Sequence, residues 1–182
     1  MSENSKVATK GLESFEPMKV AAWVLAGMKA EGGHQGLWSK GPDWYRWHAD
    51  KKWVLLDDDA VRRELWRVLE DAEQKTYGND GSMTVKRLAP DRAAVGNVME
   101  ALRSQVEYPW KEVPRWTVPG MPDASHCVAF LDVVVDVKGT AELYKERGDG
   151  TYEWVTVPRD ARFFSTGVVG VKFEEGMEGC PT

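Results

Sequence analysis

The sequence WYRWHADKKWVLLDDDAVRRELWRVLEDA, residues 44–72, decides the fold of the first half of this chain. Alternation from Trp44 to His48 predicts a strand, residues 49–52 predict a turn, and residues 53–56 predict a second, more apolar strand. Four of the nine tryptophans of the chain fall within this segment. Because tryptophan usually dominates local packing, the hairpin is expected to help organise a core.

A charged amphipathic helix is predicted to follow the hairpin, from about Asp59 to Lys75. Its apolar stripe consists of Val61, Leu65, Val68, Leu69 and Ala72. Its solvent side carries Arg62, Arg63, Arg67 and Glu70. The aspartates at 57–59 could form a metal cluster, but a helix N-terminus already accounts for them, because carboxylates cap it and favour its positive end.

Two further helices are predicted on either side of this region. The first begins near Pro17, a residue that suits an opening turn, and ends at Gly32 and Gly33. The other opens near Pro90 and carries apolar residues at helical spacing as far as Val106. Residues 76–83 between the helices are expected to form a loop.

The rest of the chain is predicted to be rich in strands. The apolar, β-branched run Cys127–Val137 is expected to be one buried strand. Residues 142–145 and 152–157 flank Arg-Gly-Asp-Gly, a hairpin signal, and residues 163–173 add short strand. The expected fold is therefore α+β: a helical subdomain with a Trp-rich β-hairpin, followed by a small antiparallel β subdomain.

The domain organisation follows from these elements. We expect a disordered leader over residues 1–13, the helical subdomain over 14–108 and the β-rich subdomain over 124–182. Residues 109–123 between them contain four prolines and are expected to form a linker.

The composition excludes several classes of protein. A net charge of −5 and a pI near 5.3 argue against a protein that coats nucleic acid through bulk charge. These values do not exclude local basic patches. No apolar run approaches the about 18 residues that span a membrane, and no secretion signal is present. The two cysteines, Cys127 and Cys180, are too few for a disulfide framework, which favours a cytosolic protein with reduced thiols.

No catalytic residue, cofactor or metal site is predicted. The Walker pattern is absent, because Ser39-Lys40-Gly41 has its residues in the wrong order, so we expect no ATPase activity in this chain alone. A metal-dependent phosphotransferase built on Asp132 and Asp136 is a third hypothesis, weakened by their separation of about 13 Å along an extended strand. Cys127 at the start of an apolar strand is expected to be inert packing.

Basic side chains near aromatic rings are the more informative pattern. Such groups can contact a phosphate backbone while rings stack on bases. We select as candidates Arg62, Arg63, Arg67, Lys86, Arg87 and Arg92, with Lys86, Arg87 and Arg92 placed at the start of a helix, and Trp44 as the stacking ring. Trp38 and Trp44 are expected to be exposed, since Gly and Pro flank them. The alternative to nucleic-acid contact is that these basic residues form a solvated charged face, on which they pair with Glu64, Glu70 and Asp71.

Three stretches resemble the N-terminal-like domain of poxvirus-type primase-helicases of phages and plasmids. They are the hairpin with Trp44, Tyr45, Trp47 and Trp53 and its helix, RAAVGNVMEALRSQV at 92–106, and VAFLDVVVDVKG at 128–139. Cys180-Pro181 matches the pair that precedes the superfamily-three helicase in that family. Asp132 and Val133 stand where the family favours Asn and Gly, so continuous strand is expected in place of a tight turn.

The resemblance implies an accessory module of a phage or mobile-element DNA-replication protein. It would couple to the helicase ring in cis or in trans and guide single-stranded or forked DNA, in a bacterial host cytoplasm. The module would be a monomer alone and part of a ring with the helicase. A second hypothesis is a protein-protein assembly module that does not contact DNA, which the acidic pI favours.

Overall fold

The computed structural model of this chain describes residues 15–77, 81–170 and 172–173. The expected leader at 1–13 and the Cys180-Pro181 pair lie outside these residues. The described part is an α+β fold with four α-helices and several small antiparallel sheets, as predicted. None of its helices has the length and apolar character needed to cross a membrane. The chain divides into two compact units.

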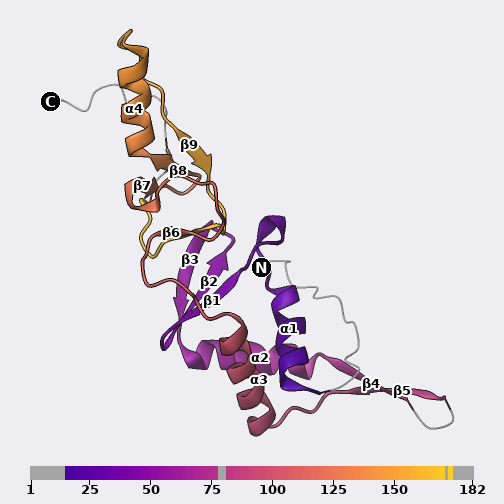
Figure 1. The fold of residues 1–182 in the computed structure, drawn as a ribbon. Coiled ribbons are helices and arrows are strands. Elements are labelled where there is room, and N and C mark those ends of the chain that lie inside the picture. Colours follow the sequence, from indigo (N-terminus) through magenta and orange to yellow (C-terminus); the bar gives the residue numbers. More distant parts are fainter. Residues whose placement is uncertain (1–14, 78–80, 171, 174–182) are drawn as a thin grey trace. The chain divides into compact units, whose positions relative to one another are not determined.

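Unit 1 comprises the described parts of Met1–Lys29, Gly36–Arg46 and Leu55–Tyr108. Its helices are α1 (Pro17–Gly27), α2 (Asp58–Glu70) and α3 (Arg92–Gln105), and α3 packs against both of the others (Figure 1). Their buried faces form one core, whose fully buried members include Val20, Leu65, Leu69, Val95, Val98 and Leu102. The predicted starts of α1 and α3 are confirmed, whereas α1 ends at Gly27, before Gly32 and Gly33.

The Trp-rich hairpin is confirmed as β2 (Asp43–His48) and β3 (Lys52–Leu56). A strand that the sequence did not predict, β1 (Leu37–Lys40), pairs antiparallel with β2, with Leu37 opposite Arg46. The backbone N–H of Ser39 in β1 donates to the carbonyl of Val106, and the Tyr108 N–H donates to the carbonyl of Ser39. These bonds tie the segment after α3 to the sheet.

A second hairpin follows α2 where the sequence predicted the end of the helix, to Lys75, and then a loop over residues 76–83. The helix ends at Glu70, and β4 (Glu73–Tyr77) pairs antiparallel with β5 (Met83–Arg87), with Glu73 opposite Arg87. Thr76, Tyr77 and Val85 have high strand propensity, and this outweighs the continued helical spacing. Figure 1 shows this β4–β5 hairpin projecting away from the three helices of unit 1.

Unit 2 comprises Ala30–Gln35, Trp47–Val54 and the described part of Pro109–Thr182. Residues 109–123, expected to be a linker, contribute β6 (Arg115–Trp116), which pairs with β10 (Phe163–Phe164). A three-stranded antiparallel sheet has the order β7 (Cys127–Ala129), β8 (Val133–Asp136) and β9 (Thr156–Pro158). Two short 3-10 helices, η1 (Glu31–Gly33) and η2 (Ala124–His126), complete the unit with α4 (Val137–Arg147).

Two strand predictions in unit 2 are wrong. The run 127–137 is a tight hairpin, because the chain turns after Ala129 and the Phe130 N–H donates to the Val133 carbonyl at 2.8 Å. Residues 142–145 lie in α4, where Ala, Leu, Glu and Lys favour helix. Gly148 ends that helix with a φ of 62°, a conformation that glycine adopts without strain, so the expected hairpin turn is a helix cap.

Asp136 is the residue that starts α4, and its replacement gives a first prediction. Its Oδ1 accepts from the Gly139 N–H at 2.9 Å, and its carbonyl accepts from the Thr140 hydroxyl at 2.7 Å. Asp136→Ala is expected to cost about 1 kcal/mol of stability, because it removes the side-chain cap. Asp136→Asn retains an acceptor and is expected to cost less. Urea unfolding of both variants measures the difference, and equal losses would contradict a capping role.

Candidate nucleic-acid interface

The outward face of α2 carries two of the predicted basic residues side by side. Arg63 and Arg67 are four residues apart and both exposed. Residues at this spacing are neighbours on a helix surface. The buried face of α2 is formed by Val61, Leu65 and Leu69, so the two arginines lie on the opposite side, toward solvent.

Two of the three acidic residues expected to neutralise this face, Glu64 and Asp71, have other partners. Glu64 forms an ion pair with Arg46 of β2, and Asp71 forms one with Arg87 at 2.9 Å. Within residues 15–77, 81–170 and 172–173, no ion pair involves Arg63 or Arg67. Both guanidinium groups are therefore available to an external anion.

Arg62 has a different environment from its neighbour Arg63. It is half-buried and lines a depression of about 400 Å³ together with Asp58, Glu100 and Arg103. The two carboxylates balance the two guanidinium groups, so this depression has no excess positive charge with which to attract a phosphate. The structure therefore separates Arg62 from the pair formed by Arg63 and Arg67.

Lys86 and Arg87 lie on β5, not at the start of a helix as predicted. All five residues of β5 are exposed. Because the two are adjacent on a strand, their side chains point to opposite faces of the hairpin. Arg92 is exposed at the start of α3, beyond the Asp91 cap. In the described part of the chain, neither Lys86 nor Arg92 forms an ion pair.

Two residues of β4 belong to this surface, and the sequence analysis missed both. Lys75 is half-buried and Tyr77 is 64% exposed, and the register pairs them with Val85 and Met83. Paired residues of an antiparallel ladder share a face, so Tyr77 and Lys75 lie on the same side as Arg87. The signal that could have found them is the alternation of Thr76, Tyr77, Thr84 and Val85 around the Asn-Asp-Gly turn sequence.

The predicted exposure of Trp44 is wrong, and so is its role as a stacking ring. Its side chain is completely buried. Its Nε1–H donates to Asp58 Oδ1 at 2.6 Å, and the guanidinium of Arg103 lies 4.7 Å from the ring centroid. The cause is the strand face: Trp44 shares it with Arg46, whose contact with Glu64 shows that α2 covers this side. Trp38 is half-buried.

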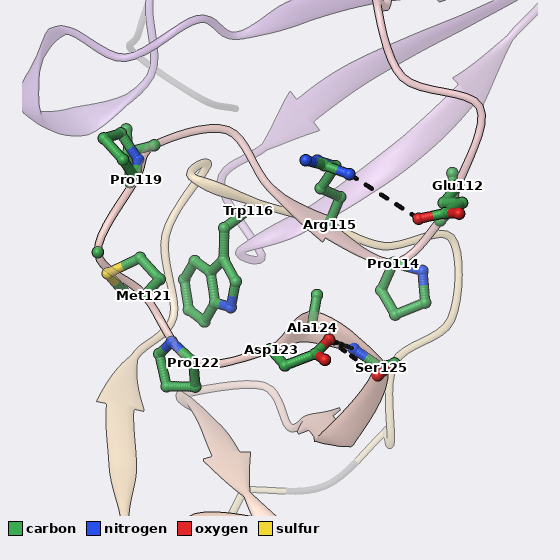
Figure 2. A pocket seen from close by; sticks show the side chains of 13 residues that line it. Glu112, Pro114, Arg115, Trp116, Pro119, Met121, Pro122, Asp123, Ala124 and Ser125 are labelled. Carbon is green, nitrogen blue, oxygen red and sulfur yellow. Dashed lines mark hydrogen bonds and ion pairs between the residues drawn. The ribbon is translucent and has the colours of Figure 1, made fainter.

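Unit 2 contains a cavity of about 470 Å³ in residues 112–125 (Figure 2). Its rings come from Pro114, Trp116, Pro119 and Pro122, and its charged side chains have partners. Arg115 lies 3.8 Å from Glu112, and Asp123 accepts from the Ser125 N–H and hydroxyl. These hydrogen bonds hold the pKa of Asp123 below its usual range, so it stays ionised near neutral pH.

The side chains that could support catalysis have structural partners. The pKa of the Cys127 thiol is raised, chiefly by burial and then by the charge of Asp136, which favours the unreactive protonated form. Asp132 accepts from the Phe173 N–H at 2.9 Å, and Asp136 caps α4. In the described residues, no group of three or more His, Cys, Asp or Glu side chains could hold a metal ion.

Comparisons with protein-family models, curated proteins and solved structures found no match to this chain.

Proposed function

We propose that this protein is a nucleic-acid-binding accessory module of a DNA-replication primase-helicase. The observation that carries the proposal is the exposed basic surface of unit 1. It consists of Arg63 and Arg67 on α2, Lys86 on β5 and Arg92 on α3, together with Arg87 on β5, which is paired with Asp71. In a chain with a net charge of −5, these cations can attract phosphate only through their local arrangement.

The β4–β5 hairpin supports contact with nucleic acid by its shape. The major groove of duplex DNA admits a two-stranded ribbon, and single strands bind exposed rings flanked by basic residues. Tyr77 is such a ring, with Lys75 two residues before it on the same face. It replaces Trp44 as the stacking candidate. The arginines would contact phosphates, which position a nucleic acid without reading its sequence.

The proposed role in DNA replication rests on a resemblance to the primase-helicase family. Three segments carry it: the hairpin, the 92–106 helix and the 128–139 segment. In this proposal the module works beside a superfamily-three helicase, in cis or in trans, in the cytoplasm of a bacterial host. It would be a monomer by itself and join a ring with the helicase.

The test is fluorescence anisotropy of labelled single-stranded and forked DNA at low and moderate salt. The wild-type protein is expected to bind, with affinity falling by a logarithmic slope of about 0.7 per phosphate contact on single strands. The Arg63→Glu/Arg67→Glu variant is expected to bind at least about tenfold more weakly and to lower the slope by about 1.4, because two contacts are lost.

A matched control separates a local interface from a general effect of charge. Lys19→Glu/Lys29→Glu makes the same change of net charge on exposed residues of unit 1, at and just beyond α1. It is expected to keep most of the affinity. Equal losses in the two variants, or no binding by the wild type at low salt, would contradict the proposal.

One observation favours the second candidate, a protein-protein assembly module. Three large apolar side chains on one face of the β4–β5 hairpin are exposed: Tyr77 at 64%, Met83 at 55% and Val85 at 43%. Such a cluster suits a protein partner. Solution mass measurements, with and without a superfamily-three helicase fragment, distinguish the candidates. A complex with the helicase and no DNA affinity would favour assembly.

A further inference from the structure

Unit 2 contains a buried arginine whose charge has no counter-ion. Arg159 is 2% exposed. Its Nε–H donates to the carbonyl of Lys51, and its Nη1 donates to the carbonyl of Phe130 at 3.0 Å. The guanidinium also lies 5.8 Å from the ring centroid of Trp47. Both acceptors are neutral, so these contacts orient the group without cancelling its charge.

The remaining nitrogen of this guanidinium is unsatisfied. Within the part of the chain that is described, Nη2 of Arg159 has no hydrogen-bond partner and no carboxylate forms an ion pair with the side chain. Burial lowers the pKa of Arg159 to about 10, so the group stays charged at neutral pH. Burying a charge without a partner is costly, and binding an anion nearby reduces that cost.

An open cavity of about 760 Å³ lies next to Arg159, which does not line it but donates hydrogen bonds to the carbonyl groups of two lining residues, Lys51 and Asp132. Its walls are the tip of the β2–β3 hairpin at 49–52, the β7–β8 turn at Leu131 and Asp132, and residues Val168, Gly170 and Lys172. Lys51 is itself one of the wall residues. Phe130, the second carbonyl acceptor of Arg159, directly precedes the wall residue Leu131. The backbone N–H of Arg159 donates to the Asp132 carbonyl at 2.9 Å, which fixes the arginine against the same turn.

Five charged side chains line the cavity, three positive and two negative. They are Lys51, Lys52, Lys172, Asp50 and Asp132. Asp50 lies 3.6 Å from Lys52 and 3.2 Å from His48. Asp132 accepts from the Phe173 N–H, which lowers the pKa of its carboxyl, and Lys172 acts in the same direction. Both carboxylates are thus engaged, and Lys51 has no ion-pair partner among the described residues.

We propose that this cavity binds a phosphate group, with Lys51 and Lys172 on its rim and the buried charge of Arg159 behind the wall residues Lys51 and Asp132. The phosphate is either that of a small phosphorylated molecule or one of a nucleic-acid backbone. The site uses no residue of the surface on unit 1, so it goes beyond the proposed function and can fail or hold independently of it.

Titration of the full chain with inorganic phosphate tests the site, followed by amide chemical shifts in NMR and compared with chloride at equal ionic strength. Phosphate is expected to shift the amides of 49–52 and of Leu131 and Asp132, and chloride is not. Lys51→Gln and Lys172→Gln are each expected to weaken phosphate binding about fivefold. Arg159→Met would also remove the donors to two carbonyls, so the rim lysines are the better variants.

Lys145→Gln is the matched control, because Lys145 is an exposed lysine of α4 in the same unit. It is expected to bind phosphate as the wild type does. Competition with a short single-stranded DNA identifies the source: displacement of phosphate assigns the site to a nucleic-acid backbone, and none assigns it to a small phosphorylated molecule. Equal shifts with chloride, no shifts, or equal weakening by Lys145→Gln would overturn the proposal.

Discussion

Trp44→Ala is expected to destabilise the protein by about 3–5 kcal/mol, the usual cost of removing a buried large aromatic side chain. Trp44 is completely buried in the core of unit 1. Its indole N–H binds Asp58 at the start of α2, and Arg103 of α3 packs over its ring. Arg103 in turn donates to Asp58 at 2.6 Å and to the Gly41 carbonyl at 2.7 Å. One side chain therefore connects the hairpin to two helices.

Urea unfolding followed by circular dichroism measures this effect. Trp44→Phe keeps an aromatic ring and loses the indole donor, so its cost is expected to be smaller than that of alanine. Leu55→Ala removes an apolar side chain that is 58% exposed in the same unit, and its effect is expected to stay within about 0.5 kcal/mol. A loss for Trp44→Ala no larger than that of Leu55→Ala would contradict the structure.

Phe163→Ala is expected to have a comparable effect in unit 2, again about 3–5 kcal/mol. The Phe163 ring is 1% exposed and lies 4.7 Å from the ring of Trp116. Its carbonyl accepts from Trp53 Nε1–H at 3.1 Å. Trp116 is the other large buried member of its cluster, and the remaining buried members are smaller: Ala124, Ala129 and Val134. Loss of the Phe163 ring therefore removes a large share of the apolar packing there.

The same unfolding measurement tests Phe163, with two comparisons. Phe163→Leu keeps most of the apolar volume and is expected to cost less than alanine. Val128→Ala shortens a side chain that is 38% exposed on β7, and is expected to change stability by no more than about 0.5 kcal/mol. If Phe163→Ala matched Val128→Ala, the packing of β10 against β6 would not have the importance assigned to it.

The parts of the fold that could be predicted are those with strong local signals. The β2–β3 hairpin alternates over several residues, and α2 and α3 have aspartate caps, Asp57 and Asp91. Helix is predicted as far as Lys75 because helical spacing continues past Glu70, where α2 ends. Strand is predicted over 142–145 because Arg-Gly-Asp-Gly is typical of a hairpin turn, whereas these residues lie in α4 and Gly148 caps it. At both places local propensity decides the structure.

The candidate site depended on contacts between residues distant in the sequence. Nothing local indicates that Glu64 pairs with Arg46, which leaves Arg63 without that partner. The burial of Trp44 likewise requires knowing that α2 covers one face of β2. Arg159 lies in an ordinary Val-Pro-Arg-Asp stretch, and its isolation from carboxylates depends on the arrangement of three separate segments of unit 2.

The β4–β5 hairpin has a consequence for behaviour at high concentration. In the described residues each of its strands pairs only with the other, so both outer edges carry backbone groups open to a further strand. A second molecule could add to such an edge and begin a continuous sheet. Lys75, Lys86 and Arg87 oppose this, since stacking copies in register would bring like charges together. The basic residues proposed to attract phosphate would also keep the molecules apart from one another.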